Sequence, residues 1–407
     1  MTKAGLLALM GQALHDFDGP LGVAVSGGGD SLAALSLAAA SAPQRLQAAT
    51  VDHRLRAESA AEAARVGEIC AQLSIPHQVL VWHHQTVTGN LQDQARQARY
   101  DLLAEWAQGR GLQAVLLGHT AEDQAECLLM GLARAAGLDG LAGMRPRFQH
   151  NSVTFLRPLL TARRADLRQY LTGQGLAWID DPSNDDDRFT RVRFRKAMAA
   201  LAPLGLTVET LAASAQHLAQ ARQAMDQSLQ QAFRKIGREQ AGALFLDHAG
   251  LAKLPPELQR RMIAAALRWI SGTPHGPRGP ALARALQSVL AGRDATLHGA
   301  RLRPRRDQIQ ITRESKAIAH HQTPTGQLWD HRWHLTGPHA PDLHLAALGA
   351  DGLRLCPEWR DLGLAREVLI VLPAVWRGDE LVAAPLVRTE TDWQASCRSF
   401  DLFILSH

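Results

Sequence analysis

The sequence has few cysteines and no paired cysteine motif. Its 407 residues include 4 cysteines, which lie far apart and form no Cys-x-x-Cys pair: Cys70, Cys127, Cys356 and Cys397. A zinc ribbon and a disulfide-stapled secreted fold both need paired or closely spaced cysteines, so we expect neither. The pattern fits a reducing compartment, and we therefore expect a cytoplasmic protein.

Long hydrophobic runs are also missing. No window approaches the roughly 18 uninterrupted apolar residues that suggest a membrane-spanning helix. Residues 1–17 instead carry apolar side chains at helical spacing, without the basic start and continuous apolar core of a signal peptide. We expect no membrane segment, and the length and 46% hydrophobic content predict two or three domains.

Two common nucleotide-binding signatures are absent as well. Residues 22–35 read GVAVSGGGDSLAAL, a glycine-rich turn between a predicted strand and a predicted helix. This turn lacks the Gly-Lys-Ser or Gly-Lys-Thr ending of a Walker P-loop, and it does not match the Gly-x-Gly-x-x-Gly signature of dinucleotide-binding folds. Glycines still let backbone N–H groups converge on an anion. The turn therefore predicts a phosphate-binding loop of another kind.

The net charge of +5 is distributed unevenly along the chain. Residues 1–200 hold 20 Lys and Arg against 20 Asp and Glu, whereas residues 261–316 hold 11 basic and 3 acidic residues. A basic segment of this kind suits a polyanion such as nucleic acid. An ordinary solvated basic surface is the alternative, and charge alone gives the two interpretations equal weight.

Short apolar runs alternate with helical runs over the first 160 residues. We expect strands at 23–25, 46–51, 78–82 and 114–117, and helices at 30–40, 58–73, 91–108 and 120–135. Nearly all-apolar strands separated by helices predict a parallel sheet covered on both faces, a doubly wound α/β fold. Ligands of such sheets bind beyond the carboxyl ends of the strands.

Three domains are expected. Residues 1–204 would form the α/β domain, 205–321 a helical and basic domain, and 322–407 a small α/β or β-rich domain. In the second, helices are predicted at 208–236, 257–271 and 281–291, followed by an arginine-rich hairpin. A further hairpin is predicted within 372–385.

The glycine-rich turn resembles the PP-loop of the ATP pyrophosphatase superfamily, whose members split ATP between the α and β phosphates. The resemblance implies that ATP is bound by Ser26, Gly27, Gly28, Gly29, Asp30 and Ser31. It also implies Mg²⁺ at Asp30, a task suited to a hard oxygen ligand.

Further segments within residues 15–200 are similar to the tRNA(Ile)-lysidine synthetase family. They are VDHRLRAESAAEA (51–63), GHTAEDQAECLLMGLARAAGLDGLAGM (118–144), RPLLTARRADLRQYL (157–171) and WIDDPSNDDDRFTRVRFR (178–195). A fainter likeness continues through 296–314. Cys127 stands where the family usually has Thr, and Val192 where it usually has Asn, so we assign no role to either position.

The family resemblance implies a ligase that forms a carbon–nitrogen bond. ATP activates carbon 2 of the wobble cytidine in an isoleucine tRNA with the anticodon CAU, and the amine of free L-lysine displaces AMP to give lysidine. The implied catalytic residues are Asp30, Arg56, Asp123 and Glu126. In the family the last two positions recognise lysine, and their spacing of three places both carboxylates on one helix face beyond a strand. A solvated acidic face is the alternative.

The resemblance also implies contacts to ATP and tRNA. His53 and His119 each follow a strand and are expected near ATP; the alternative is that they are packed residues that bind no ligand. Arg56 would neutralise the α-phosphate. The arginines expected to contact tRNA are Arg188, Arg191, Arg193, Arg195, Arg301, Arg303, Arg305 and Arg306. Neutralised phosphates would make this binding salt-dependent. The sequence leaves a monomer or a homodimer open.

Two other functions compete with this interpretation. A PP-loop tRNA thiolase also adenylates a base, but its sulfur chemistry generally needs clustered thiols, and the cysteines here are scattered. A non-catalytic tRNA-binding protein could keep the same fold. The presence of Asp30, Asp123 and Glu126 argues against such a loss of activity.

Overall fold

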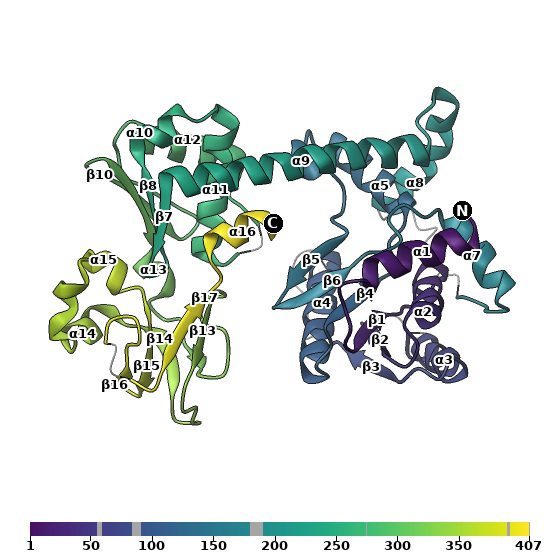
Figure 1. Cartoon of the computed structure of the whole chain (residues 1–407), viewed down its shortest axis with the longest axis horizontal. Coiled ribbons are helices and arrows are strands. Elements are labelled where there is room, and N and C mark those ends of the chain that lie inside the picture. Colours follow the sequence, from purple (N-terminus) through teal and green to yellow (C-terminus); the bar gives the residue numbers. More distant parts are fainter. Residues whose placement is uncertain (55–58, 84–90, 180–189, 274, 389–390, 407) are drawn as a thin grey trace. The chain divides into compact units, whose positions relative to one another are not determined.

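The computed structural model describes residues 1–54, 59–83, 91–179, 190–273, 275–388 and 391–406 (Figure 1). The chain divides into two compact units, Met1–Arg222 and Gln223–His407. The division falls within one helix, α9 (Val208–Ile236). The three-domain arrangement expected from the sequence stays a prediction.

A six-stranded sheet forms the centre of the first unit. Its order is β3-β2-β1-β4-β6-β5, and all neighbouring strands are parallel except the edge pair β5–β6. The strands are β1 (Leu21–Ala24), β2 (Leu46–Asp52), β3 (His77–Val81), β4 (Ala114–Leu117), β5 (Arg147–His150) and β6 (Val153–Leu156). The doubly wound α/β fold predicted from the sequence is confirmed.

Helices cover both faces of this sheet because its strands are apolar on both sides. Val23 and Leu116 pack in one core with α1, α2, α3 and α7, whereas Ala24 and Leu117, the next residues of the same strands, pack in a second core with α4. The helices of the unit are α1 (Lys3–Leu14), α2 (Gly29–Ser41), α3 (Ser59–Gln72), α4 (Leu91–Gly109), α5 (Ala121–Leu132), α6 (Leu138–Leu141), α7 (Arg164–Gly173) and α8 (Thr190–Leu201), followed by a 3-10 turn, η2 (Ala202–Leu204).

The second unit contains a five-stranded antiparallel sheet in addition to its helices. The order is β7-β8-β11-β10-β9, and the predicted arginine-rich hairpin is its pair β10–β11. The elements are β7 (Gly237–Gln240), β8 (Ala243–Asp247), α10 (His248–Lys253), α11 (Pro256–Ser271), α12 (Gly279–Leu290), β9 (Ala295–Leu297), β10 (Ala300–Arg305) and β11 (Gln308–Arg313).

The rest of the second unit is mostly short strands. It contains a four-stranded sheet, β12-β14-β15-β16, and a two-stranded sheet, β13–β17. The pair β15–β16 is the hairpin predicted within 372–385. The elements are α13 (Ser315–Ile318), β12 (Thr323–Pro324), β13 (Trp333–Thr336), β14 (His344–Ala347), α14 (Gly349–Arg354), η3 (Pro357–Leu362), α15 (Arg366–Leu369), β15 (Pro373–Arg377), β16 (Glu380–Ala383), β17 (Gln394–Cys397) and α16 (Phe400–Ser406).

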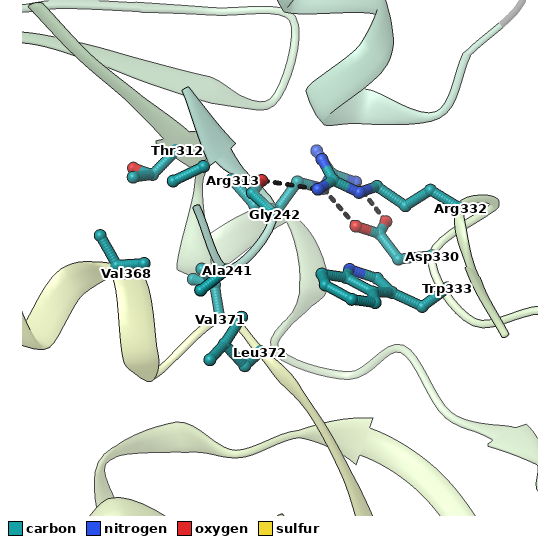
Figure 2. A pocket seen from close by; sticks show the side chains of 11 residues that line it. Ala241, Gly242, Thr312, Arg313, Asp330, Arg332, Trp333, Val368, Val371 and Leu372 are labelled. Carbon is teal, nitrogen blue, oxygen red and sulfur yellow. Dashed lines mark hydrogen bonds and ion pairs between the residues drawn. The ribbon is translucent and has the colours of Figure 1, made fainter. Parts of the chain in front are cut away.

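Arg332 joins the two hydrophobic cores of the second unit (Figure 2). Its guanidinium donates hydrogen bonds to the carbonyl oxygens of Gly242, Trp269 and Ile270 and lies 4.1 Å from the centre of the Trp269 ring. A cavity of about 10 Å³ adjoins it. That volume suits one water molecule rather than a substrate, so this region is a structural junction.

Among the described residues, no single helix combines the length and hydropathy needed to cross a membrane. One bent pair, Thr190–Leu204 with Val208–Ile236, meets that criterion by length and composition only.

Candidate active site

The glycine-rich loop joins β1 to α2 at the carboxyl edge of the sheet. Gly27 has a φ of +88°, and a Cβ atom there would lie 2.8 Å from Ile179 Cδ1. The Ser31 hydroxyl accepts a hydrogen bond from the Ser26 N–H at 3.1 Å and donates one to the Gly28 carbonyl at 2.9 Å. The hydroxyls of Ser26 and Ser31 lie 3.2 Å apart. Both serines therefore brace the loop, whose glycines leave the start of α2 open to an anion.

Asp30 stands in the first turn of α2 with one oxygen engaged. Its Oδ2 accepts from Arg164 Nε at 2.8 Å, whereas its Oδ1 is buried without a hydrogen-bond partner among the described residues. Burial raises the pKa of Asp30, and Arg164 counteracts that shift. A buried carboxylate oxygen without a partner is a suitable ligand for Mg²⁺, so the residues present fit this metal.

Asp123 lies in the first turn of α5 and helps to cap the helix. Its Oδ2 accepts a hydrogen bond from the Thr120 N–H at 2.8 Å, which is one of the two bonds of a capping box, and another from the Thr120 hydroxyl at 3.0 Å. Burial opposes ionisation, but Arg164, the Thr120 N–H and Arg191 outweigh it and lower the pKa of Asp123. Asp123 is therefore a fixed negative charge.

Glu126 lies one helical turn after Asp123 and is fully buried. Its Oε1 accepts from Arg195 Nε at 3.0 Å, and its Oε2 has no partner in the part of the chain that the structure describes. Burial and the neighbouring charge of Asp123 raise the pKa of Glu126. The two acids that the sequence places on one helix face thus differ: one is held ionised, and the other takes a proton more readily.

Arg164 at the start of α7 brings the two carboxylate regions together. Besides its bond to Asp30, its Nη2 lies 3.8 Å from Asp123 Oδ2. Sequence reasoning missed this residue, because nothing in the spacing of RPLLTARRADL indicates which of its arginines points inward. The direction of its side chain depends on tertiary packing, because α7 packs along α2 in the same hydrophobic core.

The two histidines lie in different surroundings. His119 follows β4 and is half-buried. Its Nδ1 atom is buried and unpartnered among the described residues, and desolvation lowers its pKa to about 3. His53 follows β2 and packs edge-on against Trp82, with ring centres 5.8 Å apart. Both thus follow strands, as predicted; Arg56 lies outside the described residues.

Two arginines expected to bind tRNA from α8 point instead to the acidic residues of α5. Arg195 pairs with Glu126, and Arg191 Nη1 lies 3.9 Å from Asp123 Oδ1. Arg193 donates to Thr190 Oγ1 at 3.2 Å. Arg188 lies outside the described residues. Contacts of these arginines to tRNA stay a prediction.

The arginines of the second unit differ in their partners. Arg303 pairs with Asp294 at 3.3 Å and with Glu367 at 2.8 Å, and Arg305 pairs with Asp294 at 3.0 Å. No ion pair or side-chain hydrogen bond joins Arg301 or Arg306 to another residue that the structure describes in this unit. These two are therefore the more available cations of the four.

Residues from four helices, α2, α5, α7 and α8, thus converge beside the glycine-rich loop, all within the first unit. Their buried polar atoms without a described partner are Asp30 Oδ1, His119 Nδ1 and Glu126 Oε2. Buried polar atoms are normally hydrogen-bonded, so atoms left unpartnered next to ionised residues indicate a ligand site.

Comparison with known proteins agrees with this geometry. The sequence profile of the PP-loop domain family matches residues 8–201. A tRNA(Ile)-lysidine synthase of Ruegeria pomeroyi is 45% identical over 394 residues, which cover 95% of this chain and 94% of that protein. The chain belongs to the tRNA(Ile)-lysidine synthase family. The resemblance predicted from the sequence is therefore confirmed.

Other tRNA(Ile)-lysidine synthases are similar over a shorter span. That of Novosphingobium aromaticivorans is 44% identical over 296 residues, covering 71% of this chain and 86% of that protein. A solved structure of the U34-tRNA thiolase NcsA of Methanococcus maripaludis is similar at a TM-score of 0.47 and 15% identity, over 53% of this chain and 78% of that chain. Membership in the PP-loop family means that this chain is an enzyme that uses ATP.

Proposed function

We propose that this chain synthesises lysidine in isoleucine tRNA. In the first step, the O2 atom of the wobble cytidine in a CAU anticodon attacks the α-phosphorus of ATP, and pyrophosphate leaves. In the second step, the ε-amine of L-lysine bonds to carbon 2 of the cytidine while the carbon–oxygen bond breaks, and AMP leaves. The observation that carries the proposal is the pair Asp123 and Glu126, buried beside the loop that holds Asp30.

Each residue has a role that its surroundings support. The open start of α2 would receive the phosphates, and Asp30 would hold Mg²⁺, which supplies positive charge that stabilises the departing pyrophosphate. Asp123, which stays ionised, would attract the positively charged lysine. Glu126, whose pKa is raised, would accept a proton from the lysine ammonium.

The cysteine thiols favour lysine over sulfur as the second substrate. Burial raises the pKa of Cys70 to about 11, and it also raises the pKa of Cys127, Cys356 and Cys397. Thiols of this kind stay protonated near neutral pH and are poor nucleophiles.

A mass spectrum of isoleucine tRNA tests the proposal. The purified full-length chain is incubated with the tRNA, ATP, Mg²⁺ and L-lysine, and the anticodon fragment is expected to gain the mass of lysine minus water. Omitting lysine gives the control. Unmodified tRNA in the complete reaction would refute the function, and transfer of sulfur from a persulfide donor would establish the thiolase instead.

A further inference from the structure

Arg164 contacts carboxylates on both sides of the proposed site. Its Nε donates to Asp30 Oδ2 at 2.8 Å, and its Nη2 lies 3.8 Å from Asp123 Oδ2. Asp30 belongs to the nucleotide side and Asp123 to the lysine side of the proposed reaction. One guanidinium therefore supplies positive charge to both.

The position of Arg164 is fixed by the ends of two helices. Glu122, in the first turn of α5, accepts the Arg164 N–H on Oε2 and the Arg163 Nε–H on Oε1, each at 2.9 Å. Glu122 is buried, and the Arg164 side chain is only 20% exposed. Glu122 anchors the main chain of Arg164 and not its side chain. The guanidinium therefore lies at the site but takes no part in capping the helix.

Cations that bind either carboxylate compete with Arg164 for the negative charge of the same side chain. Mg²⁺ at Asp30 and the ammonium group of lysine at Asp123 both carry the charge that the guanidinium supplies. Because these groups are largely withdrawn from water, their interactions are weakly screened. A change of partner at Asp30 therefore changes the strength of the interaction between Arg164 and Asp123.

We propose that Arg164 is a positioning residue that couples nucleotide binding to lysine binding. As Asp30 turns to the metal-bound nucleotide, Arg164 moves from Asp30 toward the phosphate oxygens and away from Asp123. Asp123 then accepts the lysine ammonium without competition. The inference rests on the proposed function, and by linkage lysine strengthens nucleotide binding by the same factor.

Calorimetric titration of L-lysine tests this coupling. The full-length chain is titrated with Mg²⁺ present, with and without a non-hydrolysable ATP analogue. We expect the analogue to tighten lysine binding about tenfold in the wild type, a typical size for coupled sites. In Arg164→Gln we expect a ratio near one, because no guanidinium is shared. Arg164→Lys, which keeps the charge, should restore part of the ratio.

Arg163→Gln is the matched control. This neighbouring guanidinium pairs with Glu122 and Glu209, so its removal should leave the wild-type ratio unchanged. A ratio near one in the wild type, or a wild-type ratio in Arg164→Gln, would overturn the role of Arg164. If the wild type made no lysidine in the tRNA mass spectrum, the proposed function itself would fail. If the wild type forms lysidine but the ATP analogue does not change its affinity for lysine, only the coupling is refuted.

Discussion

Individual side chains of the site combine structural and chemical tasks, and Asp123 shows this most clearly. Its Oδ2 closes the capping box of α5, whereas its Oδ1 faces Arg191. A carboxylate with two tasks needs two variants to separate them.

Replacing Asp123 by Asn should raise the lysine concentration needed for half-maximal rate at least tenfold, with a smaller change for ATP, because the partner of the lysine cation loses its charge. Steady-state kinetics with each substrate varied gives both values. Thr120→Ala is the control: it removes a hydroxyl from the cap, should cost about 1 kcal/mol of stability, and should leave the lysine requirement unchanged. Equal effects of Asp123→Asn on both substrates would contradict a lysine-binding role.

His119 should make the folded chain sensitive to acid. Its pKa is lowered to about 3 by burial, whereas an unfolded histidine titrates near 6.5, so the unfolded chain binds a proton that the folded chain excludes between these values. The stability from this residue is complete above about pH 6.5 and is lost as the pH falls. Between pH 7 and pH 5, the free energy of unfolding should fall by about 2 kcal/mol less in His119→Gln than in the wild type, as measured by urea unfolding at each pH.

Residue types, spacing and the family resemblance predicted which acids belong to the candidate site, but not their partners. Asp30, Asp123 and Glu126 were predicted because their motifs match the family and because each follows a strand or shares a helix face. Arg164 and Arg195 could not be predicted as their partners, because the contacts of a long side chain depend on how its helix packs against others. Arg164 lies 134 residues after Asp30 along the chain, and Arg195 lies 69 residues after Glu126.

At the scale of elements, local patterns located most of the sheet. The predicted strand at 114–117 coincides with β4, and the strands predicted at 23–25, 46–51 and 78–82 overlap β1, β2 and β3. The pair β5–β6 was missed because its edge strand, RFQH, has one apolar residue and so lacks the apolar pattern of the predicted strands. The strand β7, GREQ, has no apolar residue and directly follows the long α9, so β7 and its partner β8 were missed as well.

The approach of β4 to the glycine-rich loop depends on Gly118. A Cβ atom at this position would lie 2.6 Å from the Asp30 carbonyl oxygen and 2.8 Å from Ser31 Cα, both backbone atoms that cannot give way without moving α2. Gly118→Ala should therefore cost about 2 kcal/mol of stability and weaken ATP binding. Thermal unfolding and nucleotide titration measure the two effects.

Gly11→Ala provides the comparison for that substitution. Gly11 lies in α1 with nothing within 4 Å of an added Cβ, so alanine there should raise stability by up to about 1 kcal/mol and leave ATP binding unchanged. Wild-type affinity for ATP in Gly118→Ala would show that the loop adapts to the added methyl group.

At the scale of the whole molecule, tRNA binding should depend on both units, because arginines expected to contact tRNA lie in α8 as well as in and beside β10. Binding of ATP and lysine should depend on the first unit alone. The residues proposed for ATP and lysine lie in Met1–Arg222, and the basic strand β10 lies in Gln223–His407. The excess of basic residues at 261–316 overstates how many arginines are available to bind a polyanion, because Arg303 and Arg305 form ion pairs with acidic side chains.

Reversing the charges of Arg301 and Arg306 together should weaken tRNA binding and reduce the slope of log affinity against log salt by about 1.5, as expected for two lost phosphate contacts. Binding isotherms at several salt concentrations give this slope. Arg303→Gln should leave the slope unchanged, since its guanidinium already pairs with Asp294 and Glu367. A slope that does not change in the double variant would identify this strand as ordinary surface.

The beginning of α7 has a wider consequence. Because Glu122 holds the amide of residue 164 rather than its side chain, any amino acid with an N–H can occupy that position while the helix keeps its anchor. A library randomised at codon 164 would therefore keep this anchor in every member except proline, and its members should differ in how strongly nucleotide and lysine binding are linked.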